Sequence, residues 1–157
     1  MIQAHPECDT LIIDLRRHPG GYSLAMEYVR EYVSLLQIPS IKQSYVITDG
    51  YTASGAIACI DLFRDALGAV TVGEPTGQFT AFFAFNAPLN IRLPRSQLEI
   101  NVANEWVEGT YPERALYDEN GKLYAWENTV LPDVFVTQDV EDLRQGRDSV
   151  LQWILEQ

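Results

Sequence analysis

The feature that most constrains this chain is an alternation of short apolar runs with stretches of helical periodicity. The runs Thr10–Arg16, Ser44–Thr48 and Ala69–Val72 are rich in β-branched residues and bounded by charged or turn-forming residues, which is typical of strands buried on both faces. Between them, over Tyr22–Gln37 and Ala56–Leu67, apolar residues recur every three or four positions, as on one face of a helix. This order of elements predicts a parallel α/β sheet with right-handed crossovers.

The second half of the chain predicts a different arrangement. Three strand-like runs joined by short turns indicate a β-rich sub-layer beside the α/β units. These runs are Phe79–Phe85, Leu89–Leu93 and Leu98–Ala103. The stretch Asn104–Asn120 is polar and aromatic with little periodicity, which predicts a long surface loop. We expect a last strand over Leu131–Val136, followed by a short helix that Asp148 caps and that runs through Ile154.

Length and charge limit the kinds of protein that this chain can be. Its 157 residues suit one globular domain over residues 1–157. The formal net charge of −11 repels phosphate backbones, so nucleic acid is not an expected partner. No apolar run is long enough to span a membrane. Cys8 and Cys59 show neither metal-ligand spacing nor a disulfide framework, and we expect no metal and no cofactor.

Ser54 is the most informative polar residue, because it lies between a predicted strand and the start of a predicted helix. Backbone N–H groups at a helix start are unpaired and carry partial positive charge, so they can stabilise an oxyanion beside the serine hydroxyl. Gly55 next to it permits the close approach of a substrate. A serine at this position can equally serve as the helix cap. The local sequence leaves both roles open.

A second glycine-bearing turn, Arg16–Gly21, follows the first predicted strand. If the first two strands are neighbours, the amides of Gly20 and Gly21 face Ser54 from the same edge of the sheet, where open parallel sheets bind ligands. The alternative is a plain β-to-α turn. A phosphate-binding loop is disfavoured because the Gly-x-x-x-x-Gly-Lys pattern is absent and the chain is acidic.

Six fragments, taken in order along the chain, resemble the tail-specific (C-terminal-processing) serine peptidases, the group that includes the tricorn core protease. Two of them cover the turns described above: Asp14–Gly21 resembles the D-L-R-x-N-P-G-G signature, and Thr52–Ala56 resembles the T-A-S-A-S/T-F-S-S-A nucleophile turn. The other four, with the family pattern in parentheses, are Val72–Gly77 (V-G-E-x-T-x-G), Leu93–Ser96 (L-P-x-S), Val130–Val134 (G-V-x-P-D-I) and Glu141–Leu151 (E-D-x…G-x-D-x-x-L).

The resemblance implies a ClpP/crotonase-like α/β core of stacked β-β-α units with an added β-rich sub-layer. It implies that Ser54 is the nucleophile that attacks a peptide carbonyl. It also implies an oxyanion hole formed by the amide of Gly55 and by that of Gly20 or Gly21. A serine hydroxyl needs a base within hydrogen-bond reach to become a nucleophile.

The chain departs from the family pattern at the base. One branch of the family has a lysine in a Gly-Lys step just past the third turn, but here the step is Gly77-Gln78. The two lysines, Lys42 and Lys122, do not match that position. A Ser–Lys mechanism is therefore not expected.

The tricorn-like branch takes a histidine from a segment N-terminal to all of the matched fragments, together with a glutamate near the P-D-I segment. Glu127 matches that glutamate as an orienting carboxylate, or it is a surface carboxylate of a loop. His18 stands where the family usually has asparagine, so we expect it to order the first turn; a role as the base is the alternative. His5 is the weaker candidate of the two histidines. The simplest account places the base in an upstream segment.

The resemblance implies a polypeptide substrate and an upstream segment of the same protein, with a PDZ-like domain that recruits substrate. The chain starts at Met1 as if in mid-protein and shows no signal peptide, whereas family members are often extracytoplasmic, so its compartment is left open. An alternative is a non-catalytic module of the same fold that binds apolar ligands or peptides, which the run Phe79–Phe85 motivates. A third possibility is that uncovered aromatic strand surface drives self-association.

Overall fold

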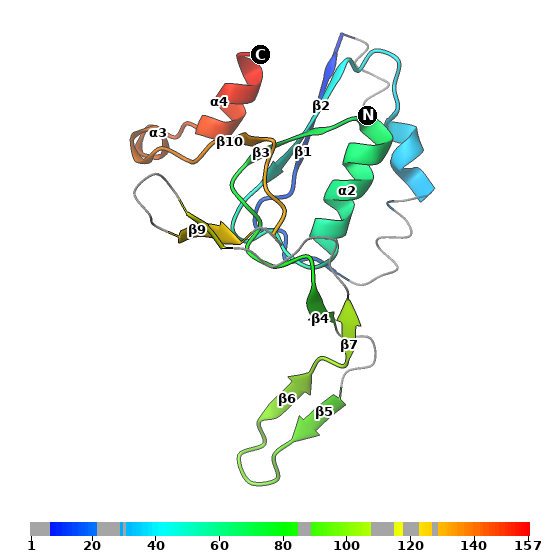
Figure 1. The fold of residues 1–157 in the computed structure, drawn as a ribbon, viewed down its shortest axis with the longest axis vertical. Coiled ribbons are helices and arrows are strands. Elements are labelled where there is room, and N and C mark those ends of the chain that lie inside the picture. The colour runs from blue at the N-terminus through cyan, green and yellow to red at the C-terminus, as the bar shows by residue number, and fades with distance from the viewer. Residues whose placement is uncertain are drawn as a thin grey trace. The chain divides into compact units, whose positions relative to one another are not determined.

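The computed structural model describes residues 7–21, 29, 31–84, 89–107, 115–117, 123–126 and 129–157 (Figure 1). The chain divides into two compact units. The first comprises residues 1–78 and 129–157, and the second comprises residues 79–128. The single domain over residues 1–157 stays a prediction.

A four-stranded parallel sheet organises the first unit, as the sequence predicts. Its strands are β1 (Thr10–Asp14), β2 (Gln43–Thr48), β3 (Val70–Gly73) and β10 (Val134–Phe135). They lie in the order β1-β2-β3-β10, and every neighbouring pair is parallel. The register places Ile12 of β1 beside Tyr45 of β2, and Ile47 of β2 beside Val72 of β3. The carboxyl ends of all four strands therefore meet at one edge of the sheet.

Helix α2 (Gly55–Leu67) connects β2 to β3 and packs on one face of the sheet (Figure 1). Its apolar residues recur at helical spacing, and Ile57, Ile60 and Phe63 bury their side chains. The helix ends at Gly68, which adopts the left-handed conformation with φ of 61°. A cluster on this face joins the helix to Val46 of β2.

The opposite face of the sheet is covered by helix α4 (Ser149–Leu155). Side chains of a strand alternate between the two faces, so Tyr45 and Ile47 point away from Val46 and pack with Val150 and Ile154 of α4. Asp148 caps α4, because its side chain accepts a hydrogen bond from the Leu151 amide at 2.9 Å. The predicted cap and helix are confirmed. A preceding helix, α3 (Val140–Arg144), is not predicted from the sequence.

The helix predicted over Tyr22–Gln37 falls partly outside the described residues. The described part is helical at positions 29, 31 and 32 and tightens into the 3₁₀ helix η2 (Val33–Leu36). Val33 is buried and joins the cluster under α2. No helix among the described residues combines the length and apolar character needed to cross a membrane.

The second unit is built from three antiparallel pairs of strands. The pairs are β4 (Phe82–Ala84) with β7 (Glu105–Val107), β5 (Leu89–Arg92) with β6 (Glu99–Val102), and β8 (Ala115–Tyr117) with β9 (Leu123–Trp126). The predicted surface loop over Asn104–Asn120 is wrong where it contains β7 and β8. These three-residue strands are too short for a visible alternation, and the pairing partner determines their conformation.

Candidate active site

Ser54 lies at the edge where the parallel strands end, at the N-cap position of α2. Its backbone is strained, with φ of 53° and ψ of −127°, which is uncommon for a residue other than glycine. Its side chain makes no capping hydrogen bond. Ser54 thus occupies the cap position without performing the usual function of a cap. Gly55 is the first residue of α2, so its amide has no partner within the helix.

The first turn packs directly against Ser54. Gly20 has φ of 91°, and a Cβ atom on it would overlap the Ser54 Cβ and lie 2.7 Å from the Gly55 nitrogen. A Cβ on Gly21 would meet nothing within 4 Å. The fold therefore brings together Ser54, Gly55 and Gly20, and only glycine fits at the contact between the two turns.

Two residues that the sequence analysis did not single out hold these turns together. Thr52 is fully buried, and its hydroxyl lies 2.9 Å from the Leu15 carbonyl oxygen, to which it donates. The same hydroxyl oxygen accepts a hydrogen bond from the Asp49 amide at 3.1 Å. The Asp49 carboxylate in turn accepts from the Arg17 amide at 3.0 Å. Thr52 and Asp49 could have been identified from the sequence as polar residues that closely precede Ser54 in its turn.

His18 bridges the first turn to the second. The Gly20 amide donates a hydrogen bond to the His18 Nδ1 atom at 3.1 Å. The His18 carbonyl oxygen accepts from the Ala53 amide, also at 3.1 Å. His18 orders the turn through both its backbone and its ring, as the sequence analysis expects.

The third turn reaches Ser54 through Gln78. The Gln78 side-chain carbonyl accepts a hydrogen bond from the Ser54 amide at 2.7 Å. Gln78 occupies the step where the Ser–Lys branch would carry its lysine, and an amide side chain has no basic nitrogen to take a proton. Gly77 in the same turn packs against the Gly50 carbonyl so closely that a Cβ atom would collide with it. The third turn thus supports the backbone of Ser54 and supplies no base.

Glu127 and His5 lie outside the described residues, so the structure places neither. The segment that follows Glu127 is tied to the third turn, because the Val130 amide donates to the Thr76 hydroxyl at 3.0 Å. Asp133 in this segment accepts from the Thr71 amide at 2.8 Å and pairs with Arg64 at 3.2 Å. Burial raises the pKa of Asp133, but its bonds to Thr71 and the charge of Arg64 outweigh this and hold it below the ordinary value.

Arg16 connects the first turn to the end of the unit. Its guanidinium lies 2.7 Å from a carboxylate oxygen of Asp14 and 2.7 Å from one of Asp148. Burial raises the pKa of both carboxyls, but hydrogen bonds to Arg16 outweigh this, so the pKa of each lies below its ordinary value. The pKa of Arg16 lies above its ordinary value, mainly because of its bond to Asp14.

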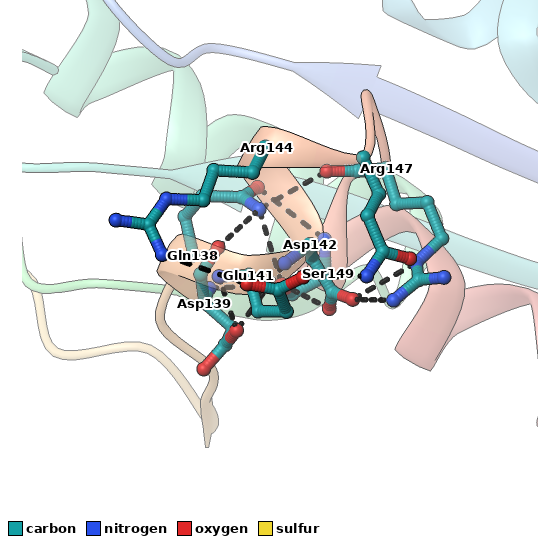
Figure 2. A network of polar contacts seen from close by, with 8 residues as sticks. Gln138, Asp139, Glu141, Asp142, Arg144, Arg147 and Ser149 are labelled. Atoms are coloured by element: carbon teal, nitrogen blue, oxygen red, sulfur yellow. Dashed lines mark hydrogen bonds and ion pairs between the residues drawn. The ribbon is translucent and has the colours of Figure 1, made fainter.

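A polar network around α3 fixes the loop that carries Asp148 (Figure 2). The Ser149 hydroxyl donates to Asp142 at 2.8 Å and accepts from the Asp139 amide at 2.9 Å. Arg147 binds the other carboxylate oxygen of Asp142 at 2.6 Å. The closing motif of the sequence thus has a structural role: it holds Asp148 where it caps α4 and meets Arg16.

A cavity of about 580 Å³ opens at the carboxyl ends of the four strands. Its lining includes Arg16, Arg17, Glu74 and Asp148, and Ser54 does not line it. Among the residues that the structure describes, no group of three or more acidic, histidine or cysteine side chains could hold a metal ion.

Neither a protein-family model nor a curated protein matches this sequence. Solved structures do match. One is a candidate peptidase from Parabacteroides merdae, with a TM-score of 0.61 and 18% identity over 99% of this chain. Another is a candidate S41 protease from Bacteroides fragilis, with a TM-score of 0.59 and 13% identity over 99% of this chain. The tricorn protease matches with a TM-score of 0.57 and 17% identity over 94% of this chain.

The chain has an S41 peptidase fold. The resemblance inferred from the six sequence fragments is thereby confirmed for the fold. The photosystem II D1 C-terminal processing protease shares this fold, with a TM-score of 0.50 and 14% identity over 87% of this chain. This chain covers 54% of the Parabacteroides protein, 46% of the Bacteroides protein and 14% of the tricorn protease. The chain therefore spans about half the length of the first two, and much less of the third.

Proposed function

We propose that this chain is the catalytic core of a serine peptidase of the tail-specific or tricorn-like kind. The Ser54 hydroxyl oxygen attacks the carbonyl carbon of a peptide bond and forms an acyl-enzyme, while the leaving amine takes up the proton. Water then hydrolyses the ester and regenerates the serine. The general base comes from a segment outside these 157 residues, oriented by Glu127, so the chain alone is inactive or weakly active. A PDZ-like domain of the same protein recruits the polypeptide substrate.

The observation that carries this proposal is the conformation of Ser54. Holding a residue other than glycine at φ of 53° and ψ of −127° costs on the order of 1–3 kcal/mol, and a helix cap needs no such strain. Strain of this kind is typical of catalytic and ligand-binding residues, and here it leaves the hydroxyl outside the helix hydrogen bonds.

The surroundings of Ser54 support an oxyanion hole. Gly55 begins α2 directly after the serine, and Gly20 of the first turn packs against Ser54. Losing one donor of an oxyanion hole costs about 2.7–4 kcal/mol of transition-state stabilisation. We further propose that the parallel sheet with α2 belongs to a ClpP/crotonase-like core of stacked β-β-α units.

Labelling with a fluorophosphonate probe tests the nucleophile. Because the base lies outside the chain, we expect slow labelling of the 157-residue chain, accelerated by free imidazole as a soluble base. The adduct, located by mass spectrometry of peptides, is expected on Ser54 and lost in Ser54→Ala. The matched control is Ser96→Ala, which is expected to label like the unaltered chain. Absence of labelling in the presence of imidazole, or an adduct on another serine, would contradict the proposal.

A second candidate function is a binding module for apolar ligands on the same fold. It is favoured by Phe83 and Trp106, two residues that are 63% and 56% exposed and whose rings lie edge to face with their centres 4.9 Å apart. Titration with a fatty acid or a retinoid, followed by Trp fluorescence, is expected to saturate at micromolar concentration if the module reading is right. Loss of that response in Phe83→Ser, together with unlabelled Ser54, would favour the module over the peptidase.

A further inference from the structure

The first turn, Arg16–Gly21, is the oxyanion turn of the proposed site. Among the residues that the structure describes, His18 is the side chain that accepts a hydrogen bond from a glycine amide of this turn. Its Nδ1 atom accepts the N–H of Gly20, two residues ahead, at 3.1 Å. Its carbonyl oxygen accepts the amide of Ala53, which directly precedes Ser54. One residue thus binds the glycine turn on one side and the serine turn on the other.

The chemistry of this bond resembles that of an asparagine turn. In His as in Asn, the accepting atom is attached to Cγ, so Nδ1 closes the same ring with the amide two residues ahead that an asparagine oxygen closes in an Asx turn. The two side chains differ in one respect. Imidazole takes up a proton on the acidic side of neutrality, and both of its nitrogens then carry hydrogen and can no longer accept.

The packing around Gly20 leaves little room for the turn to shift without affecting the serine. A Cβ atom on Gly20 would lie 2.7 Å from the Gly55 nitrogen and 2.8 Å from the Ala53 carbonyl oxygen. A change at the His18–Gly20 bond is therefore transmitted to the backbone on both sides of Ser54. Because one N–H offers one proton, the Gly20 amide bound to His18 is also not available to a substrate.

We propose that His18 is a positioning residue of the oxyanion turn. Its unprotonated Nδ1 holds the Gly20 amide, which leaves the Gly21 amide to bind the acyl oxygen together with that of Gly55. An Nδ1 atom that carries a proton cannot accept this bond, so protonation of the ring releases Gly20 and loosens the turn. The roles of Gly21 and Gly55 rest on the proposed function, whereas the His18–Gly20 bond does not.

Other charged and titratable groups flank this turn. Arg16 and Arg17 belong to the turn itself, and Arg16 is held by Asp14 and Asp148. The turn after β2, which packs against His18, contributes Asp49 and Tyr51; the Asp49 carboxylate accepts the Arg17 and Tyr51 amides. Histidine is the only one of these side-chain types that ordinarily changes charge between about pH 5 and about pH 8.

NMR of the 157-residue chain tests the bond independently of any activity. We expect the Gly20 amide proton to shift upfield and exchange faster over the pH range in which the His18 ring signals themselves are observed to change. In His18→Asn, which keeps an acceptor but cannot take up a proton, the Gly20 amide is expected to stay unchanged over this range. A Gly20 amide that does not follow His18, or one that titrates equally in His18→Asn, would overturn the proposal.

Labelling of Ser54 by the fluorophosphonate probe tests the consequence. The ratio of the labelling rate of the unaltered chain to that of His18→Asn cancels the titration of any shared base. We expect this ratio to be near one at a pH above the range in which the His18 ring signals change, and to fall about three- to tenfold at a pH below it, the effect of one lost hydrogen bond. His18→Ala is expected to label slowly at both pH values. A constant ratio would refute the positioning role.

The phosphonylated chain distinguishes the two glycines. Once the adduct forms on Ser54, the Gly21 and Gly55 amide protons are expected to move downfield and the Gly20 amide to stay in place. A downfield shift of Gly20 instead would show that the assignment to Gly21 is wrong. If Ser54 is not labelled in any variant, the proposed function fails, and the titration of the Gly20 amide still decides whether His18 holds the turn.

Discussion

The contact between Gly20 and Ser54 sets the geometry of the candidate site. Gly20 has φ of 91°, and its missing side chain makes the space that Ser54 and Gly55 occupy. The strained backbone of Ser54 persists because neighbouring groups hold it: Gln78 binds its amide, and Thr52 fixes the turn before it. A property of one residue therefore depends on three turns that lie far apart in the sequence.

At this scale we predict opposite outcomes for the two adjacent glycines. Gly20→Ala places a Cβ atom against Ser54 and requires alanine to adopt a positive φ. We therefore expect a loss of about 1–3 kcal/mol in the free energy of unfolding, together with loss of Ser54 labelling. Gly21→Ala places its Cβ in open space and is expected to change stability by less than about 0.5 kcal/mol. Urea unfolding followed by circular dichroism measures both. Equal stability of the two variants would contradict the packing described here.

The sequence predicts where these residues lie but not how they are held. The Thr-Ala-Ser-Gly turn is as compatible with a helix cap as with a strained serine, because neither the positive φ of Ser54 nor its contact with Gly20 is specified by the local sequence. Gln78 carries no local pattern that links it to Ser54, 24 residues away. The helix boundaries fare better, since Gly68 and Asp148 act through local hydrogen bonds that a short stretch of sequence specifies.

Helix α4 depends on one carboxylate that has two roles. Asp148 caps the helix through the Leu151 amide and pairs with Arg16 on the first turn. Two substitutions separate these roles. Asp148→Asn keeps an acceptor for the cap and loses the charge, whereas Asp148→Ala loses both. We expect Asp148→Ala to lower the free energy of unfolding by about 0.5–2 kcal/mol at neutral pH, and Asp148→Asn by less.

The same pair of variants tests a dependence on pH. Carboxyl groups with a pKa below the unfolded value stabilise the fold above that unfolded value, and the contribution is lost as the pH falls through the folded value. Burial raises the pKa of Asp14 and that of Asp148, but both lie below the ordinary value of an aspartate, because each carboxylate is hydrogen-bonded to Arg16. Stability is therefore expected to fall below about pH 4, and less steeply in Asp148→Asn than in the unaltered chain. Parallel slopes in urea unfolding at a series of pH values would argue against this account.

At the scale of the whole molecule, the second unit carries an apolar strand face. The cross-strand pairs of Leu89 with Val102 and of Ile91 with Ile100 lie on one side of the β5–β6 hairpin, and each of these four side chains is at least 40% exposed. The other side is polar and includes the pair of Arg92 with Glu99. The sequence predicts these two strands, but it does not specify what covers their apolar side.

We predict that this face drives self-association of the 157-residue chain at high concentration. Replacing Ile91 and Ile100 together by Thr keeps residues that favour strands and lowers the apolar area, so the mass measured by light scattering is expected to fall toward that of the monomer. The matched control is Asn90→Thr on the polar side, which is expected to leave the mass unchanged. A clean monomer before any substitution would show that the face does not pair with itself.

The parallel sheet has a consequence for synthesis on the ribosome. β3 pairs with β2 on one side, but its other neighbour, β10, begins only at Val134. At about 5–20 residues per second, the nascent chain spends several seconds with the outer edge of β3 unpaired after that strand has emerged. The bond from Arg16 to Asp148 closes later still. The first turn, which packs against Ser54, is therefore joined to Asp148 only after all four strands of the sheet have been synthesised.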